Sequence, residues 1–151
     1  MANASAQDVL TKVLFKLDAD APSATETLWA KSLGDGLYQL DNAPWYARGC
    51  ALGDIVRCVE EEGGLPRFAE VVRPSGNRTV RIFVPDGPRR QHTKESMAEF
   101  LRSHDCSYEG MGSEKGLIAV TIPEEVRSDT IFEYLDTHET NETAYWEAAN
   151  F

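Results

Sequence analysis

Strand-like and helix-like segments alternate in the second half of the chain: RTVRIFV (78–84), TKESMAEFLRSHDC (93–106), SYEGM (107–111), GLIAVTIP (116–123), DTIFEYLDTHE (129–139) and TAYWEAANF (143–151). The second and fifth segments space their apolar residues three and four apart, as amphipathic helices do, and the other four resemble strands. The order β-α-β-β-α-β is typical of a ferredoxin-like domain. The stretch from Thr79 to Phe151 therefore decides the fold of half the protein.

Each predicted helix carries an apolar stripe that should face the core. The stripes are Met97, Phe100 and Leu101 in the first helix, and Ile131, Phe132 and Leu135 in the second. We expect Thr93 to cap the first helix, and Ser128 or Asp129 to cap the second, because hydroxyl and carboxylate side chains accept bonds from free amides at a helix start. The final segment, with alternating Ala144, Trp146 and Ala148, reads as an edge strand.

The first half of the chain contains five short strand candidates and leaves no room for helices. They cover residues 9–17, 25–33, 37–40, 52–59 and 67–73, and Gly34-Asp35-Gly36 forms a tight turn between the second and third. This spacing predicts a small antiparallel β-barrel of the SH3-like kind. No Gly/Ser- or Pro-rich linker separates residues 1–76 from residues 77–151, so we expect the two halves to pack as one rigid unit.

Composition indicates a cytoplasmic globular protein. The 151 residues carry a net charge of −10, which disfavours binding to a phosphate backbone. No apolar run approaches the ~20 residues that span a bilayer, and MANASAQD at the start lacks the features of a secretory signal. Three cysteines without a CxxC pair do not suggest a disulfide framework. We therefore expect neither a nucleic-acid nor a membrane partner.

A set of short motifs resembles a bacterial family. The motifs are LWA, G-x-Y-x-LDN-x-P-x-x-A-x-G, GD-x-V and SG-x-x-TVR, followed by GLIAV and an aromatic tail. Together, from about Phe15 to Trp146, they resemble the family catalogued as domain of unknown function 4265. Asn77 departs from the histidine expected in many relatives, which would remove any proton-transfer or metal-binding role from this position. The resemblance implies an architecture and no activity.

Within this block, polar and aromatic side chains could line a groove. The candidates are Asp41, Asn42, Trp45, Tyr46 and Asp54. Two carboxylates held in a pocket could perform acid–base chemistry. The simpler interpretation is that Asp41 and Asn42 cap a turn and that Asp54 accepts bonds from loop amides beside Gly53.

Other reactive side chains give weaker patterns. His104-Asp105-Cys106 places a histidine near a cysteine, but neighbours in sequence seldom orient toward each other, so we expect a helix end with a buried Cys106. The spacing of His92, His104 and Cys106 matches no tetrahedral metal site. We expect neither a metal nor another cofactor, and we assign no catalytic residue.

The leading hypothesis is a non-enzymatic, acidic protein-binding module, such as an immunity protein that inhibits a basic, nuclease-like toxin. Its binding residues would be the uncompensated acids near the C-terminus, which could steer a cationic partner. They are Asp129, Glu133, Asp136, Glu139, Glu142 and Glu147. One alternative is a regulatory protein whose ferredoxin-like half senses a small ligand or forms a homodimer, and another is an enzyme that uses Asp41 and Asp54.

Overall fold

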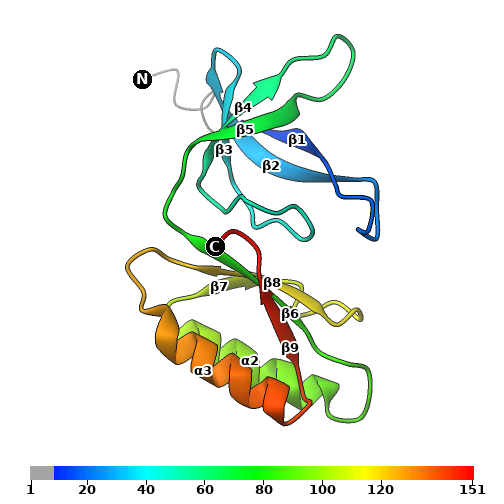
Figure 1. Cartoon of the computed structure of the whole chain (residues 1–151), viewed down its shortest axis with the longest axis vertical. Helices are drawn as coiled ribbons and strands as arrows, with labels where there is room; N and C mark the ends of the chain where they lie inside the picture. Colours follow the sequence, from blue (N-terminus) through cyan, green and yellow to red (C-terminus); the bar gives the residue numbers. More distant parts are fainter. Residues whose placement is uncertain (1–8) are drawn as a thin grey trace. The chain divides into compact units, whose positions relative to one another are not determined.

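The computed structural model describes residues 9–151. The stretch 1–8, in which no secretory signal is expected, lies outside the described residues. Between Gly76 and Asn77 the chain divides into two compact units, each with its own apolar core (Figure 1). No helix in the described part of the chain is long and apolar enough to cross a membrane.

The first unit is a closed ring of five strands. They are β1 (Leu10–Lys16), β2 (Thr25–Gly34), β3 (Leu37–Leu40), β4 (Ile55–Val59) and β5 (Arg67–Arg73). Each strand pairs antiparallel with the next, as predicted, and the ring closes where Leu14 of β1 meets Arg67 of β5 in a parallel pair. An odd number of strands cannot alternate direction all the way round a ring, so one parallel contact is required.

Alternate side chains of the strands fill the interior of this ring. Val13 and Phe15 of β1, and Leu28 and Ala30 of β2, are buried, whereas Trp29 between the last two is 46% exposed. This is the period-two pattern of strands that bury one face. The predicted hairpin between β2 and β3 is confirmed. Its turn places Gly34, Asp35 and Gly36 at positive φ, which glycine adopts without a steric penalty.

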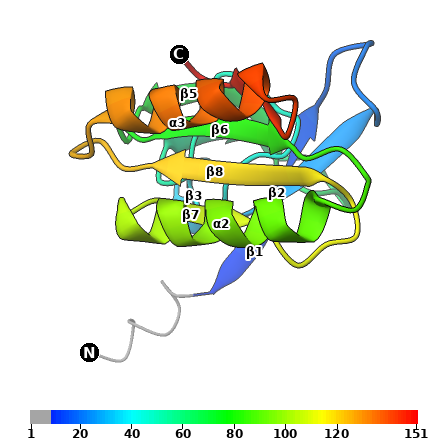
Figure 2. The same ribbon diagram turned by 90° about the horizontal axis from the view of Figure 1, so that it is seen from below.

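The second unit has the predicted β-α-β-β-α-β order. Its elements are β6 (Arg78–Phe83), α2 (Arg90–Ser103), β7 (Ser107–Glu109), β8 (Leu117–Ile122), α3 (Ser128–Thr140) and β9 (Tyr145–Ala148). The strands form one antiparallel sheet in the order β7-β8-β6-β9, with β9 at an edge as expected. Figure 2 shows α2 and α3 side by side on one face of this sheet.

The core of the second unit lies between this sheet and its two helices. Met97 and Leu101 of α2 and Ile131 and Leu135 of α3 are at most 1% exposed, so both predicted stripes face inward. The aromatic members of the stripes, Phe100 and Phe132, are half-buried at the rim of the same core. Removing this much apolar side chain from water is the main contribution to the stability of the unit.

The predicted helix caps are wrong. Helix α2 begins at Arg90 rather than after Thr93, and Arg89 occupies the N-cap position without a side-chain bond to the helix. Gly87 and Pro88 explain the earlier start, because proline has a fixed φ that suits the entry to a helix. In α3, Arg127 is the N-cap residue, and Ser128 lies inside the helix with its hydroxyl bonded to Arg78.

Candidate functional site

Four of the predicted binding residues lie together on α3. We call Asp129, Glu133, Asp136 and Glu139 the α3 acidic face. All four are exposed, whereas Ile131 and Leu135 on the other side of the helix are buried. Residues three, four and seven apart fall on one side of an α-helix, so the sequence spacing brings Asp129, Glu133 and Asp136 into a row.

The local partners of the α3 acidic face leave its charges at the surface. Asp129 forms an exposed ion pair with Arg127 at 3.2 Å, a kind of contact that contributes little in water. Asp136 accepts a hydrogen bond from the indole Nε1 of Trp146 at 3.0 Å. That bond comes from a neutral group, so it orients the carboxylate without neutralising its charge.

The other two predicted acids lie outside the α3 acidic face. Glu142 follows the end of α3 at a positive φ of 58°. Glu147 lies on β9 and pairs with Arg81 of β6 at 3.1 Å, and Arg81 is only 4% exposed. Because a buried guanidinium requires a compensating charge, we interpret Glu147 as part of the sheet.

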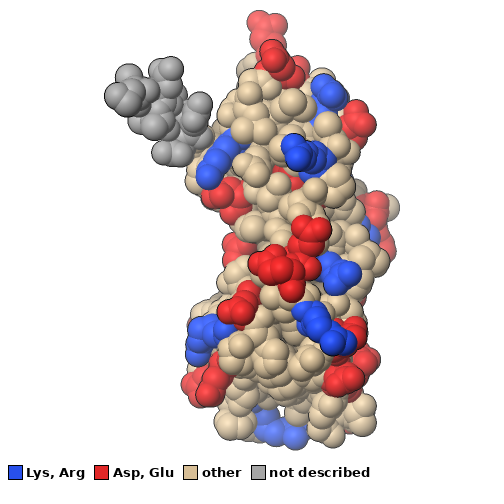
Figure 3. Space-filling model, turned by 90° about the vertical axis from the view of Figure 1, so that its left-hand side faces the viewer, with Lys and Arg blue, Asp and Glu red and all other residues tan. Residues whose placement is uncertain are grey.

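One face of the molecule carries charges of both signs. On the face drawn in Figure 3, lysine and arginine side chains lie among aspartate and glutamate side chains over most of the area. This face is therefore not uniformly acidic, despite the net charge of −10. Electrostatic steering would depend on local rows of one sign, such as the α3 acidic face.

Asp54, a candidate for acid–base chemistry, braces the loops of the first unit. It is 3% exposed, and its two carboxylate oxygens accept hydrogen bonds from the amides of Ala51 at 2.9 Å and Ser75 at 2.8 Å. Asp41, by contrast, is exposed. This geometry supports the structural interpretation of Asp54, in which a carboxylate satisfies loop amides.

The neighbouring aromatic residues are held by a side chain that sequence reasoning missed. Glu26 on β2 accepts hydrogen bonds from three successive backbone amides, those of Trp45 at 2.5 Å, Tyr46 at 3.0 Å and Ala47 at 2.9 Å. Asn42 accepts a bond from the amide of Trp29 at 2.7 Å. Both predicted groove rings, Trp45 and Tyr46, are half-buried. Nothing in the sequence TETLWA distinguishes Glu26 from an ordinary solvent-facing strand residue.

Cys106 and His104 do not form a nucleophile–base pair. Cys106 is 5% exposed, and burial together with nearby Asp105 raises the pKa of its thiol to about 11. The Nδ1 atom of His104 instead lies 2.8 Å from the carbonyl oxygen of Phe100 and 3.0 Å from the hydroxyl of Ser103. Within residues 9–151, no three His, Cys, Asp or Glu side chains are grouped as a metal site requires.

His138 makes the stability of the second unit depend on pH. Burial lowers the pKa of its imidazole below the usual 6.5, and the ring contacts Tyr134 and the hydroxyl of Thr143. The unfolded chain then binds a proton that the folded chain does not, so stability falls as the pH drops through the range just below 6.5.

We expect His138→Gln to reduce this acid-induced loss of stability between pH 7.5 and pH 5. Urea denaturation at the two pH values measures it. The exposed His92 provides the matched control, His92→Gln. An equal loss of stability in wild type, His138→Gln and His92→Gln would show that His138 is not the group responsible.

Comparison with known proteins identifies a family. No curated protein matches the chain. A crystal structure described as that of a hypothetical protein from Neisseria gonorrhoeae is similar, with a TM-score of 0.73 and 22% identity over 93% of this chain and 94% of that one. At this identity the likeness concerns the fold alone. The model of the family described as "Domain of unknown function (DUF4265)" matches residues 26–146. The resemblance seen in the sequence motifs is thereby confirmed, and the chain belongs to this family.

Proposed function

We propose that the protein is a non-enzymatic binding module whose α3 acidic face engages a basic partner protein. The observation that carries the proposal is the row of exposed carboxylates on α3, opposite the buried stripe of the same helix. A cytoplasmic inhibitor that neutralises a basic, nuclease-like toxin is the type of protein that best fits this surface. In this proposal an SH3-like barrel and a ferredoxin-like domain form the scaffold.

Electrostatics favours this role for the α3 acidic face. Carboxylates at the surface keep their hydration, so folding loses little free energy by placing them there. A row of them attracts a cationic surface over about one Debye length, ~8 Å at physiological salt. Such complementarity mainly accelerates association and selects the partner. This function requires no catalytic residue. It is therefore compatible with a structural role for Asp54, the carboxylate that braces loops in the first unit.

Neutralising the α3 acidic face should slow association with the basic partner. For the triple variant Glu133→Gln, Asp136→Asn and Glu139→Gln, we expect the association rate constant at low salt to fall about tenfold. We also expect its dependence on salt to flatten. Stopped-flow measurements on the partner captured from a native lysate test this prediction.

A second triple variant controls for total charge. Asp18→Asn, Asp20→Asn and Glu62→Gln remove the same three charges from exposed positions of the first unit. We expect its association rate to stay close to that of wild type. Equal slowing in both variants would indicate a general charge effect, and unchanged rates in both would contradict steering by α3.

A homodimer formed through the sheet of the second unit is a second candidate. Phe83 and Tyr145 are 47% and 40% exposed, and they pair with each other across β6 and the edge strand β9. An edge strand offers unpaired amide and carbonyl groups to another chain. Analytical ultracentrifugation of wild type and Tyr145→Lys tests whether this homodimer forms. A dimer through this edge should be present in wild type and should dissociate into monomers in the variant.

A further inference from the structure

The chain contains two Asp-Gly pairs, at residues 35–36 and 86–87. In such a pair the backbone nitrogen of the glycine can attack the carboxyl carbon of the aspartate, because glycine has no Cβ to obstruct the approach. The product is a five-membered succinimide ring, and water opens this ring to either aspartate or isoaspartate. The two pairs have the same sequence but different structural surroundings, so folding should make them react at different rates.

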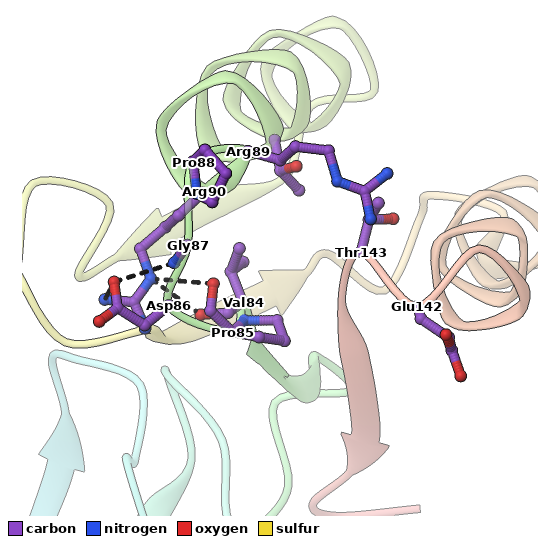
Figure 4. Close-up of a pocket in the computed structure, with 10 residues that line it drawn as sticks. Val84, Pro85, Asp86, Gly87, Pro88, Arg89, Arg90, Glu142 and Thr143 are labelled. Carbon is purple, nitrogen blue, oxygen red and sulfur yellow. Dashed lines mark hydrogen bonds and ion pairs between the residues drawn. The ribbon is translucent and has the colours of Figure 1, made fainter.

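The folded loop before α2 holds the reacting groups of Asp86 and Gly87 together. The amide nitrogen of Gly87 donates a hydrogen bond to Oδ1 of Asp86 at 3.0 Å. The carboxyl carbon that this nitrogen would attack is bonded directly to Oδ1, so the two groups are already neighbours. Contact of this kind reduces the entropy that ring closure would otherwise lose. Figure 4 shows the two residues and this contact as a dashed line.

Arg90 keeps the carboxylate of Asp86 in this position. The side chain of Asp86 is 95% exposed, but its Oδ1 lies 3.7 Å from Nη1 of Arg90, whose side chain is only 18% exposed. The guanidinium is itself anchored. Its Nε donates to the carbonyl oxygens of Val84 at 3.1 Å and Pro85 at 3.2 Å, and its Nη1 donates to that of Glu114 at 2.6 Å. An anchored cation therefore orients the carboxylate beside the Gly87 amide.

The surroundings of Gly87 leave room for the ring and for the water that opens it. Gly87 has a φ of 144°, and a Cβ at this position would meet no atom within 4 Å. Asp86 and Gly87 also line a pocket of about 160 Å³. A cavity of ~15 Å³ is already large enough for one water molecule. Neither step of the reaction is therefore blocked by neighbouring atoms.

Asp35 and Gly36 lack this arrangement. They form the turn between β2 and β3, where Asp35 has a φ of 56°. The carbonyl oxygen of Gly36 accepts a hydrogen bond from the amide of Cys58 at 2.9 Å. Within residues 9–151, the Gly36 amide does not bond to the carboxylate of Asp35. Because pairing with β4 restrains this turn, ring closure at Asp35 should be slow.

We propose that Asp86 is a site of spontaneous isoaspartate formation in the folded protein. The Gly87 nitrogen forms a bond to the carboxyl carbon of Asp86. The carboxyl group takes up a proton, and its hydroxyl leaves with the amide proton as water. A second water molecule then breaks the bond between this nitrogen and the backbone carbonyl carbon of Asp86, which becomes a free carboxylate. The reaction consumes no other reagent and leaves the composition of the chain unchanged.

The modification lengthens the backbone by one carbon atom just ahead of α2. It also creates an exposed isoaspartyl carboxylate, the group that isoaspartate-repair methyltransferases methylate. The site uses none of the α3 acidic face, so it is independent of the proposed protein partner.

Ageing of the folded, full-length protein at physiological temperature and neutral pH tests the site. After digestion with trypsin, the peptide of residues 82–89 contains Asp86 and that of residues 32–48 contains Asp35. Electron-transfer fragmentation distinguishes isoaspartate from aspartate in each peptide. We expect isoaspartate to accumulate roughly tenfold faster at Asp86 than at Asp35. No isoaspartate at Asp86, or equal rates at the two sites, would overturn the proposal.

Unfolding controls for local sequence. In concentrated urea at the same pH, the two Asp-Gly pairs should react at similar rates, because folding no longer distinguishes them. A preference for Asp86 that persisted in urea would contradict the role assigned to the folded loop.

Two matched variants provide a second readout. Asp86→Asn and Asp35→Asn each create an Asn-Gly pair, which forms the same ring with loss of ammonia, so the change of mass reports the rate. Both positions are exposed, and the asparagine oxygen can still accept the bond from Gly87, so folding should be retained. In the folded protein we expect Asp86→Asn to deamidate roughly tenfold faster than Asp35→Asn. Equal deamidation rates would contradict the proposal.

Discussion

Replacing Gly116 by alanine should lower the free energy of unfolding of the second unit by roughly 3 kcal/mol, among the larger effects of a single substitution. A Cβ at this position would lie 2.1 Å from the backbone oxygen of Val84. Its other neighbours, the Phe83 ring and the Arg90 guanidinium, would be at 3.0 Å. The amide of Val84 also bonds to the carbonyl of Gly116 at 2.8 Å, so the clash disrupts the β6–β8 pairing.

The loop before β8 has little freedom to relax around the new methyl group. The Nζ atom of Lys94 donates hydrogen bonds to the carbonyl oxygens of Ser113 and Lys115, and Arg90 donates to that of Glu114. Gly112 in the same loop provides the control, because a Cβ there would meet nothing within 4 Å. Urea denaturation should show a large shift for Gly116→Ala and a shift within about 0.5 kcal/mol for Gly112→Ala. Similar stabilities for the two variants would show that the loop does adapt.

Asp54→Ala should destabilise the first unit by roughly 2–4 kcal/mol, because it leaves one buried and one partly buried amide without their charged acceptor. The amides of Ala51 and Ser75 lose their partners together, and they are 24 residues apart in sequence. The loop before β4 and the segment after β5 would then separate. Thermal and urea denaturation of wild type and variant measure the loss.

Asp41→Ala is the matched control for Asp54→Ala. Asp41 is an exposed aspartate in the segment just after β3, and its side chain forms no hydrogen bond within the described residues. We expect its removal to change stability by less than about 0.5 kcal/mol. If Asp54→Ala were as stable as Asp41→Ala, the bracing role would be wrong, and the alternative of an enzyme that uses both carboxylates would gain support.

Most of the architecture was predictable because side-chain periodicity is a local property. Alternating burial in β1 and β2, and stripes three and four residues apart in α2 and α3, follow directly from the order of apolar residues. The starts of the helices were not predictable in this way. Thr93 is a good capping residue by type, but Pro88 sets the helix start earlier, and Thr93 lies inside the helix with its backbone amide bonded to Arg89.

The candidate sites depend on contacts between distant residues, which local patterns do not encode. The row of carboxylates on α3 was predictable, since helical spacing alone places Asp129, Glu133 and Asp136 together. The hydrogen bonds that the Glu26 carboxylate accepts from three amides about 20 residues away were not.

Affinity capture from a native cell lysate tests the central claim most directly. Tagged wild type, the α3 triple variant and the control triple variant would each be used at low and high salt, with bound proteins identified and quantified by mass spectrometry. We predict one stoichiometric basic partner that binds wild type and the control variant at low salt, and that is lost at high salt or with the α3 variant. Capture of that partner by the α3 variant at wild-type level, or no partner under any condition, would contradict a binding function for the α3 acidic face.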